Sequence, residues 1–171
     1  MHELVPHVPE HHLGAFDAKI AQEIVASYWQ LDSSTREALR TPLERLNLAI
    51  RRVRVVDAAI DLGIALEALL LRDLPQDGPI SYSMRLRGAW LWGGGAQGRK
   101  DTFQILKKVY DLRSKAVHKG QLPDKTTNQS SLRKGNSICA GLIGRVIRRS
   151  GFPDDWTEAI LGIENSEEAV S

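Results

Sequence analysis

The sequence predicts an all-α protein built as a helical bundle, and three observations support that prediction. Apolar residues recur at spacings of three and four along most of the chain, whereas the two-residue alternation of half-buried strands is almost absent. The length of 171 residues suits one domain, and the 42% share of apolar residue types is enough to form a core. Because only 6% of the residues are aromatic, Leu, Ile, Val and Ala are expected to fill that core.

The first half of the chain predicts an irregular segment over residues 1–13, followed by a series of helices. A first helix is expected over residues 15–30, with one apolar side made of Ile20, Ile24, Val25 and Tyr28. Asp32-Ser33-Ser34 ends it and offers an N-cap to the next. That second helix is interrupted or begins at Pro42, and its apolar residues at helical spacing are Leu43, Leu46, Ile50 and Val53. The same periodicity then continues over residues 55–71.

The second half predicts four more helices, separated by glycine-rich or polar loops. A short helix is expected over residues 82–92, and a strong one over residues 99–117 that stops near Gly120, a residue type favoured just after a helix end. A helix over residues 131–149 has the apolar side Ile138, Leu142, Ile143, Val146 and Ile147. A last short helix is expected over residues 152–163. The domain is therefore expected to span residues 14–164, with an acidic tail over residues 165–171.

Charge is distributed unevenly along the chain, although the net charge is only +2. Residues 99–150 hold 13 Lys and Arg against 3 Asp and Glu. This basic segment fits either a surface that faces a polyanion or a solvated helix face with the acidic C-terminal residues folded against it.

Several classes of protein are disfavoured by composition. The single cysteine, Cys139, excludes an intramolecular disulfide and a cysteine-rich zinc site. The longest apolar stretch, over residues 62–71, is too short to span a membrane, and no signal peptide is recognisable, so we expect a cytoplasmic protein with no membrane segment. The N-terminal histidines are interpreted as a polar start, and neither a metal nor a cofactor is predicted; these histidines are His2, His7, His11 and His12.

Two charged residues occur where helical periodicity places apolar ones. On a helical wheel of about 100° per residue, Arg113 lies within the apolar half of its helix, and Glu67 lies within the apolar side of residues 55–71. Burying either charge alone would cost several kcal/mol, so we expect the two side chains to pair. A purely structural pair, or two side chains that reach the surface, are the alternatives. Asp57 and Asp61 fall on the opposite side and are expected to be solvated.

His118 is the third candidate residue. It lies five residues after Arg113, about 140° further round an ideal helix, and in the last turn before Gly120. Both groups can face one ligand if the helix frays, or if the site lies at the helix edge or at a seam with another subunit. A histidine suits proton transfer, because the ordinary charge change of imidazole lies close to neutral pH.

The segment Tyr110–Gly120, YDLRSKAVHKG, resembles the HEPN superfamily, whose mark is an R-x4–6-H motif near the end of a long helix. The residues of this segment are most similar to those of the ApeA-like branch, and so are DLGIALEALLL at residues 61–71 and SYSMRLRGA at residues 81–89. The resemblance covers residues 43–120. It implies a bundle that dimerises through the motif-bearing helices, with Arg113 and His118 as the catalytic pair. Ser114 occupies a position where members often have Asn, Asp or His, and Glu67 would orient Arg113.

The function that this resemblance implies is metal-independent cleavage of RNA, in a toxin or antiphage-defence setting. RNA carries its own nucleophile in the 2′-OH, so histidines from two subunits can serve as base and acid while Arg113 holds the phosphate. Six basic residues are expected to guide the RNA backbone: Lys107, Lys108, Lys115, Lys119, Arg133 and Lys134. An antitoxin or sensor protein is a possible further partner. The alternatives are a non-catalytic HEPN module that binds RNA or assembles proteins, and an unrelated helical adaptor or DNA-binding protein.

Overall fold

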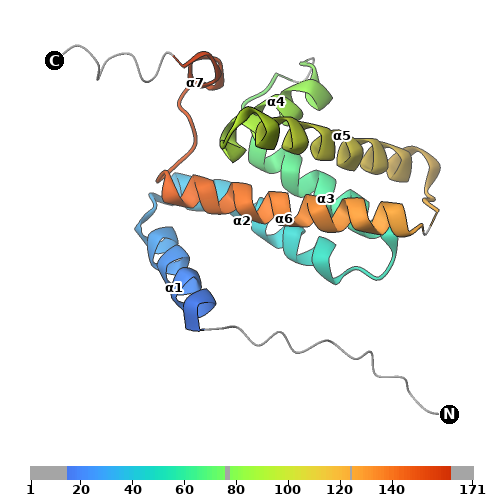
Figure 1. The fold of residues 1–171 in the computed structure, drawn as a ribbon, viewed down its shortest axis with the longest axis horizontal. Helices are drawn as coiled ribbons and strands as arrows, with labels where there is room; N and C mark the ends of the chain where they lie inside the picture. Colours follow the sequence, from blue (N-terminus) through green and yellow to red (C-terminus); the bar gives the residue numbers. More distant parts are fainter. Residues whose placement is uncertain (1–14, 76–77, 124, 163–171) are drawn as a thin grey trace.

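A computed structural model describes residues 15–75, 78–123 and 125–162, and this part of the chain is helical with no strand (Figure 1). Its seven helices are α1 Ala15–Gln30, α2 Ser33–Arg51, α3 Val55–Leu70, α4 Ile80–Trp92, α5 Ala96–Lys119, α6 Thr126–Arg148 and α7 Trp156–Leu161. The prediction of an all-α helical bundle is therefore confirmed. The predicted irregular start and acidic tail, together with the four N-terminal histidines, lie outside the described residues.

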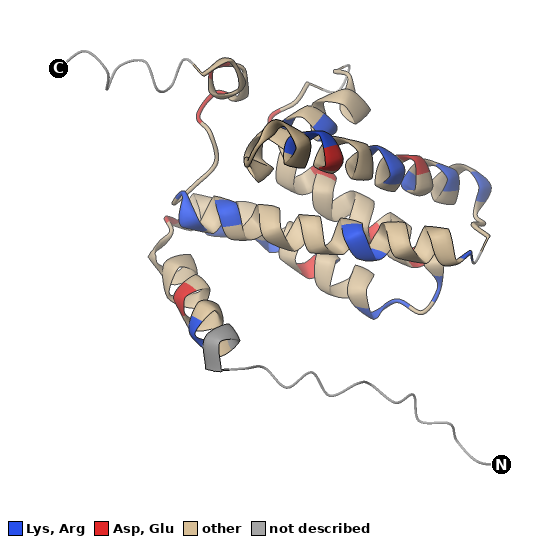
Figure 2. Ribbon diagram, viewed as in Figure 1, with Lys and Arg blue, Asp and Glu red and all other residues tan. Residues whose placement is uncertain are grey.

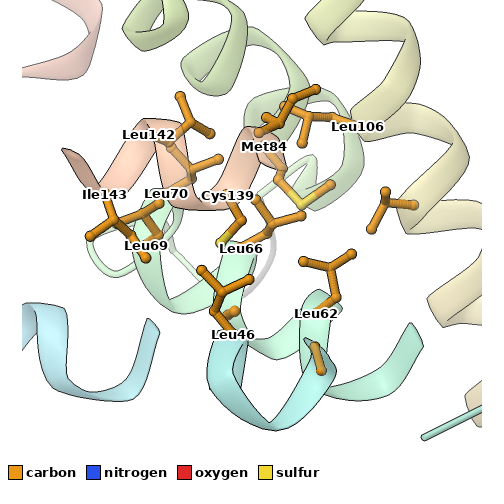
Figure 3. Packing of buried hydrophobic residues seen from close by; sticks show 14 of the residues in the cluster. Leu46, Leu62, Leu66, Leu69, Leu70, Met84, Leu106, Cys139, Leu142 and Ile143 are labelled. Carbon is orange, nitrogen blue, oxygen red and sulfur yellow. The ribbon is translucent and has the colours of Figure 1, made fainter. Parts of the chain in front are cut away.

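Helices α3 and α6 form the centre of the bundle, because they contact each other and each of them also contacts α2, α4 and α5. Leucine is the commonest residue type of the core, and Figure 3 shows leucines that converge from α2, α3, α5 and α6: Leu46, Leu62, Leu66, Leu69, Leu70, Leu106 and Leu142. The predicted apolar side of α6 is confirmed in full, since all five of its residues are buried. In Figure 1, α1 and α7 lie at the edge of the bundle. No helix in the described part of the chain is both long enough and apolar enough to cross a membrane.

The apolar side predicted for the second helix is wrong in all but one residue. The side that packs inward is made of Leu39, Pro42, Leu46 and Ala49, so Pro42 lies inside the helix and is itself buried. Val53 follows the end of α2 and is 97% exposed. Apolar residues occur on two sides of α2, and the side that packs against α3 is the one that is covered.

The expectation that Asp61 is solvated is also wrong, because its side chain is only 3% exposed. It accepts a hydrogen bond from Nη1 of Arg45 at 2.9 Å and one from Nε of Arg52 at 2.8 Å. Arg45 belongs to α2 and Arg52 is its C-cap. Because α2 packs along α3, it covers the side of α3 that helical periodicity predicts to be polar. Asp57, one turn earlier on α3, lies 3.8 Å from Arg54 and stays partly exposed.

The helix that carries the candidate motif is longer than predicted and ends where predicted. Helix α5 begins at Ala96, three residues before the expected start, and stops at Gly120, whose φ of 63° is in the left-handed region. Its core-facing residues include Leu106, Val109 and Ala116. Helix α6 begins five residues earlier than predicted, so the connection from α5 to α6 is short and the two helices run side by side.

Candidate functional site

Glu67 and Arg113 meet between α3 and α5, which confirms the pairing predicted from the two helical wheels. Nη2 of Arg113 donates to Oε2 of Glu67 at 3.0 Å. The side chains are 24% and 28% exposed, so the pair lies at the edge of the core and is only partly reached by solvent.

Gly63 makes this contact possible. It lies one turn before Glu67 on α3, and the stem of Arg113 passes directly over it: a Cβ at Gly63 would overlap Cγ of Arg113 and lie 3.0 Å from its Cβ. The segment Asp61–Leu71 therefore contributes a glycine seat as well as the glutamate. Helical periodicity places Gly63 on the apolar side of α3 but does not predict this close contact, although the absence of a side chain lets a neighbouring element approach closely.

The electrostatics of the pair are set by burial. Burial raises the pKa of the Glu67 carboxyl above its ordinary value, and the charge and hydrogen bond of Arg113 offset part of that rise. Glu67 accepts a hydrogen bond from only one nitrogen of the Arg113 guanidinium. Its Nε is buried without a hydrogen-bond partner, and its Nη1 makes no hydrogen bond to any residue in the described ranges.

A small cavity of about 230 Å³ opens beside the pair. Glu67 and Arg113 form its polar wall, and the remaining walls are apolar or aromatic: Leu71, Leu74, Pro75, Ile80 and Tyr110. An ion pair at the rim of an apolar cavity offers one cation and one carboxylate to a small polar group, in surroundings where water screens them less than at the open surface.

His118 lies in the last turn of α5, as predicted, and its side chain is exposed. Within the described part of the chain it forms no hydrogen bond or ion pair, and it does not contact Glu67. Arg113 and His118 are about 140° apart around the helix, and Ser114, Tyr110 and Val117 lie on the side between them. Val117 is 52% exposed, although helical periodicity places it in the apolar half of the helix. One subunit therefore places the two motif residues on opposite flanks of one partly apolar helix side.

The six basic residues predicted to bind RNA do not form one surface. Figure 2 shows Lys and Arg positions repeated along α5 toward the α5–α6 connection and on the facing stretch of α6. Lys107 is held by Asp111, one turn later, at 2.8 Å. Arg133 lines a separate cavity with Arg52, between the α2–α3 turn and α6. Lys108 and Lys134 line one groove between α5 and α6, while Lys115 and Lys119 are exposed on α5.

Among the described residues, no group of three His, Cys, Asp or Glu side chains has the arrangement that could hold a metal ion. The arrangement of the site is therefore an ion pair, a small cavity and an exposed histidine on one helix. Comparison of the chain with protein-family models, with curated proteins and with solved structures gives no match, so the family membership suggested by the motif stays a prediction from the sequence.

Proposed function

We propose that this protein is a metal-independent endoribonuclease of the HEPN type, acting as a homodimer in the cytoplasm in a toxin or antiphage-defence setting. The observation that carries the proposal is the half-buried Arg113, fixed by Glu67 and Gly63, on the helix that presents an exposed His118 in its last turn. A guanidinium held in one orientation suits a phosphate, and an accessible imidazole suits proton transfer.

A second copy packed against α5 would complete the site. The helix side between Arg113 and His118 carries Tyr110, Ser114 and the exposed Val117, and the exposed Tyr82 lies on the neighbouring α4. Packing two such sides together would cover apolar surface and bring both motif residues of each subunit to the seam.

Cleavage of RNA at such a dimer interface would need no cofactor. One His118 takes the proton of the 2′-OH as the 2′-oxygen forms a bond to phosphorus, and the His118 of the second copy gives a proton to the departing 5′-oxygen. Nη1 of Arg113 holds a non-bridging phosphate oxygen and stabilises the charge that develops there. The products are a 2′,3′-cyclic phosphate and a 5′-hydroxyl.

The test is cleavage of labelled single-stranded RNA by the purified protein in the presence of a metal chelator. His118→Ala should lower the rate by at least about 100-fold, since general acid–base groups contribute that much or more. Gln121→Ala, at an exposed residue just after the end of α5, is the matched control and should cleave normally. RNA with 2′-O-methyl groups should stay intact. Equal cleavage by His118→Ala and the unaltered protein would refute the assignment.

The second candidate is a non-catalytic HEPN module that binds RNA or assembles proteins. The pairing of Arg113 with Glu67 favours it, because a motif arginine committed to a carboxylate can be purely structural. A protein that dimerises and leaves RNA intact under all these conditions would fit this candidate.

A further inference from the structure

A groove of about 420 Å³ runs between α5 and the first half of α6. Two lysines and four hydroxyl-bearing residues line it, with one apolar residue: Lys108, Lys134, Thr126, Thr127, Ser130, Ser131 and Ile105. The α6 members recur at spacings of four residues, so they share one helix side. None of the lining residues is acidic.

The two lysines are available to a ligand. Both side chains are exposed, and neither forms an ion pair with a residue in the described ranges, in contrast to Lys107. Of the four hydroxyls, Ser131 donates to the carbonyl of Thr127. Two ammonium groups beside a row of hydroxyls, with no carboxylate among the lining residues, recognise the oxygens of a phosphate.

The basic side of α5 extends beyond this groove. Lys115 and Lys119 follow Lys108 by 7 and 11 residues, which places all three within about 40° of one another around the helix. From Lys108 to Lys119 the helix rises about 16 Å, toward the turn that carries His118. A single phosphate would occupy only part of this length, whereas a chain of phosphates would follow it.

We propose that the α5–α6 groove and the lysines that continue it along α5 bind the phosphate backbone of single-stranded RNA on the flank of α5 opposite the Glu67–Arg113 pair. The inference rests on the proposed RNA substrate and specifies how that substrate lies. The backbone follows α5 from Lys108 toward the motif end, where His118 is exposed and where the proposed dimer interface would bring the motif residues of both copies together. The positive end of the α6 dipole adds to the attraction, and the lysines provide its anchor points.

The salt dependence of binding tests this proposal without depending on cleavage. The probe is a 2′-O-methylated single-stranded RNA of about twelve nucleotides, which keeps its phosphates and lacks the attacking hydroxyl. Affinity is measured by fluorescence anisotropy from low to moderate salt for the unaltered protein and for Lys108→Gln/Lys134→Gln. Each phosphate contact contributes about 0.7 to the slope of log affinity against log salt on a single strand. Loss of two contacts should therefore reduce the slope by about 1.4 and weaken binding by about tenfold or more near 0.1 M salt.

Two further variants serve as controls, one for the position of the lost charges and one for the charge itself. Lys19→Gln/Lys100→Gln removes the same charge from α1 and from the N-terminal part of α5, and should leave the slope within experimental error. Lys108→Arg/Lys134→Arg keeps both charges and should bind like the unaltered protein. Circular dichroism checks that all variants are folded.

The outcomes separate this groove from the proposed catalysis. Equal slopes for the groove variant and for Lys19→Gln/Lys100→Gln would overturn the groove, even if RNA is cleaved in a His118-dependent way. A reduced slope for the groove variant alone supports the groove, even if the unaltered protein leaves RNA intact. Absence of binding at low salt would overturn it outright.

Discussion

Removal of Arg113 should destabilise the protein in a way that depends on pH. The charge centres of Arg113 and Glu67 are about 4 Å apart for a 3.0 Å contact, which corresponds to about 4 kcal/mol at an effective dielectric constant of about 20. Because about a quarter of each side chain is exposed, we expect Arg113→Met to cost about 3 kcal/mol near pH 7.5. For a domain of this size, that lowers Tm by about 6–12 °C.

The sign of the pH dependence follows from Glu67. Burial already raises the pKa of its carboxyl, and Arg113 holds that pKa down. Without Arg113 the folded pKa rises further above the unfolded value, so the ionised carboxylate penalises the fold more strongly as pH increases. Stability of the variant should therefore recover as pH falls toward the ordinary pKa of glutamate.

Urea denaturation followed by circular dichroism, near pH 5 and near pH 7.5, measures this effect. Glu67→Gln keeps an acceptor for Nη2 but leaves the half-buried guanidinium without its counter-charge, so it should cost about 1–2 kcal/mol, less than Arg113→Met. The double variant Arg113→Met/Glu67→Gln should be more stable than Arg113→Met near pH 7.5, because no buried charge is left unpaired. If the double variant is no more stable and Arg113→Met shows no dependence on pH, the pair does not have the electrostatic role inferred from its geometry.

Three other predictions test the packing around the site. Gly63→Ala should cost about 1–3 kcal/mol in denaturant melts, because the new methyl group overlaps the stem of the motif arginine; Gly144→Ala, where a Cβ meets only a guanidinium end 3.8 Å away, should be tolerated, and equal costs would contradict this. Asp61→Asn should cost about 2 kcal/mol, since it removes a buried carboxylate from two partly exposed arginines. The matched change Asp57→Asn should cost less than about 0.5 kcal/mol, and a similar loss for both would rule out the special role of Asp61. Burial raises the pKa of the Cys139 thiol to about 12, so an alkylating reagent near neutral pH should label it only after unfolding; rapid labelling of the native protein would disprove that burial.

Helical periodicity predicts this fold well wherever one side of a helix is clearly apolar. Helix α1 has the predicted bounds, and all five apolar residues expected to face the core on α6 do so. The same reasoning fails on α2, where two sides carry apolar residues and the packing against α3 chooses Pro42 and Ala49 over Leu43 and Ile50. Which side is covered depends on the neighbouring helix, and that information is not contained in the local pattern.

In the candidate site, too, the sequence predicts some of the contacts and not others. Glu67 and Arg113 are charged residues on the apolar sides of their helices, so the sequence alone predicts that they need partners. The structure brings them together. Asp61 lies on the side of α3 that helical periodicity predicts to be polar, so the sequence gives no sign of its burial. It is buried only because α2 covers that side. The α5–α6 groove combines residues from two helices, and no spacing within one segment predicts it.

The shared guanidinium makes proton uptake and anion capture interdependent. An anion that engages Nη1 of Arg113 draws on the same positive charge that keeps the neighbouring Glu67 carboxylate ionised at its half-buried position. Glu67 then gains affinity for a proton when the anion arrives, and by reciprocity a protonated Glu67 leaves Arg113 more attractive to the anion. Mild acidification should therefore tighten the hold of Arg113 on a negatively charged ligand while the ligand itself keeps its charge.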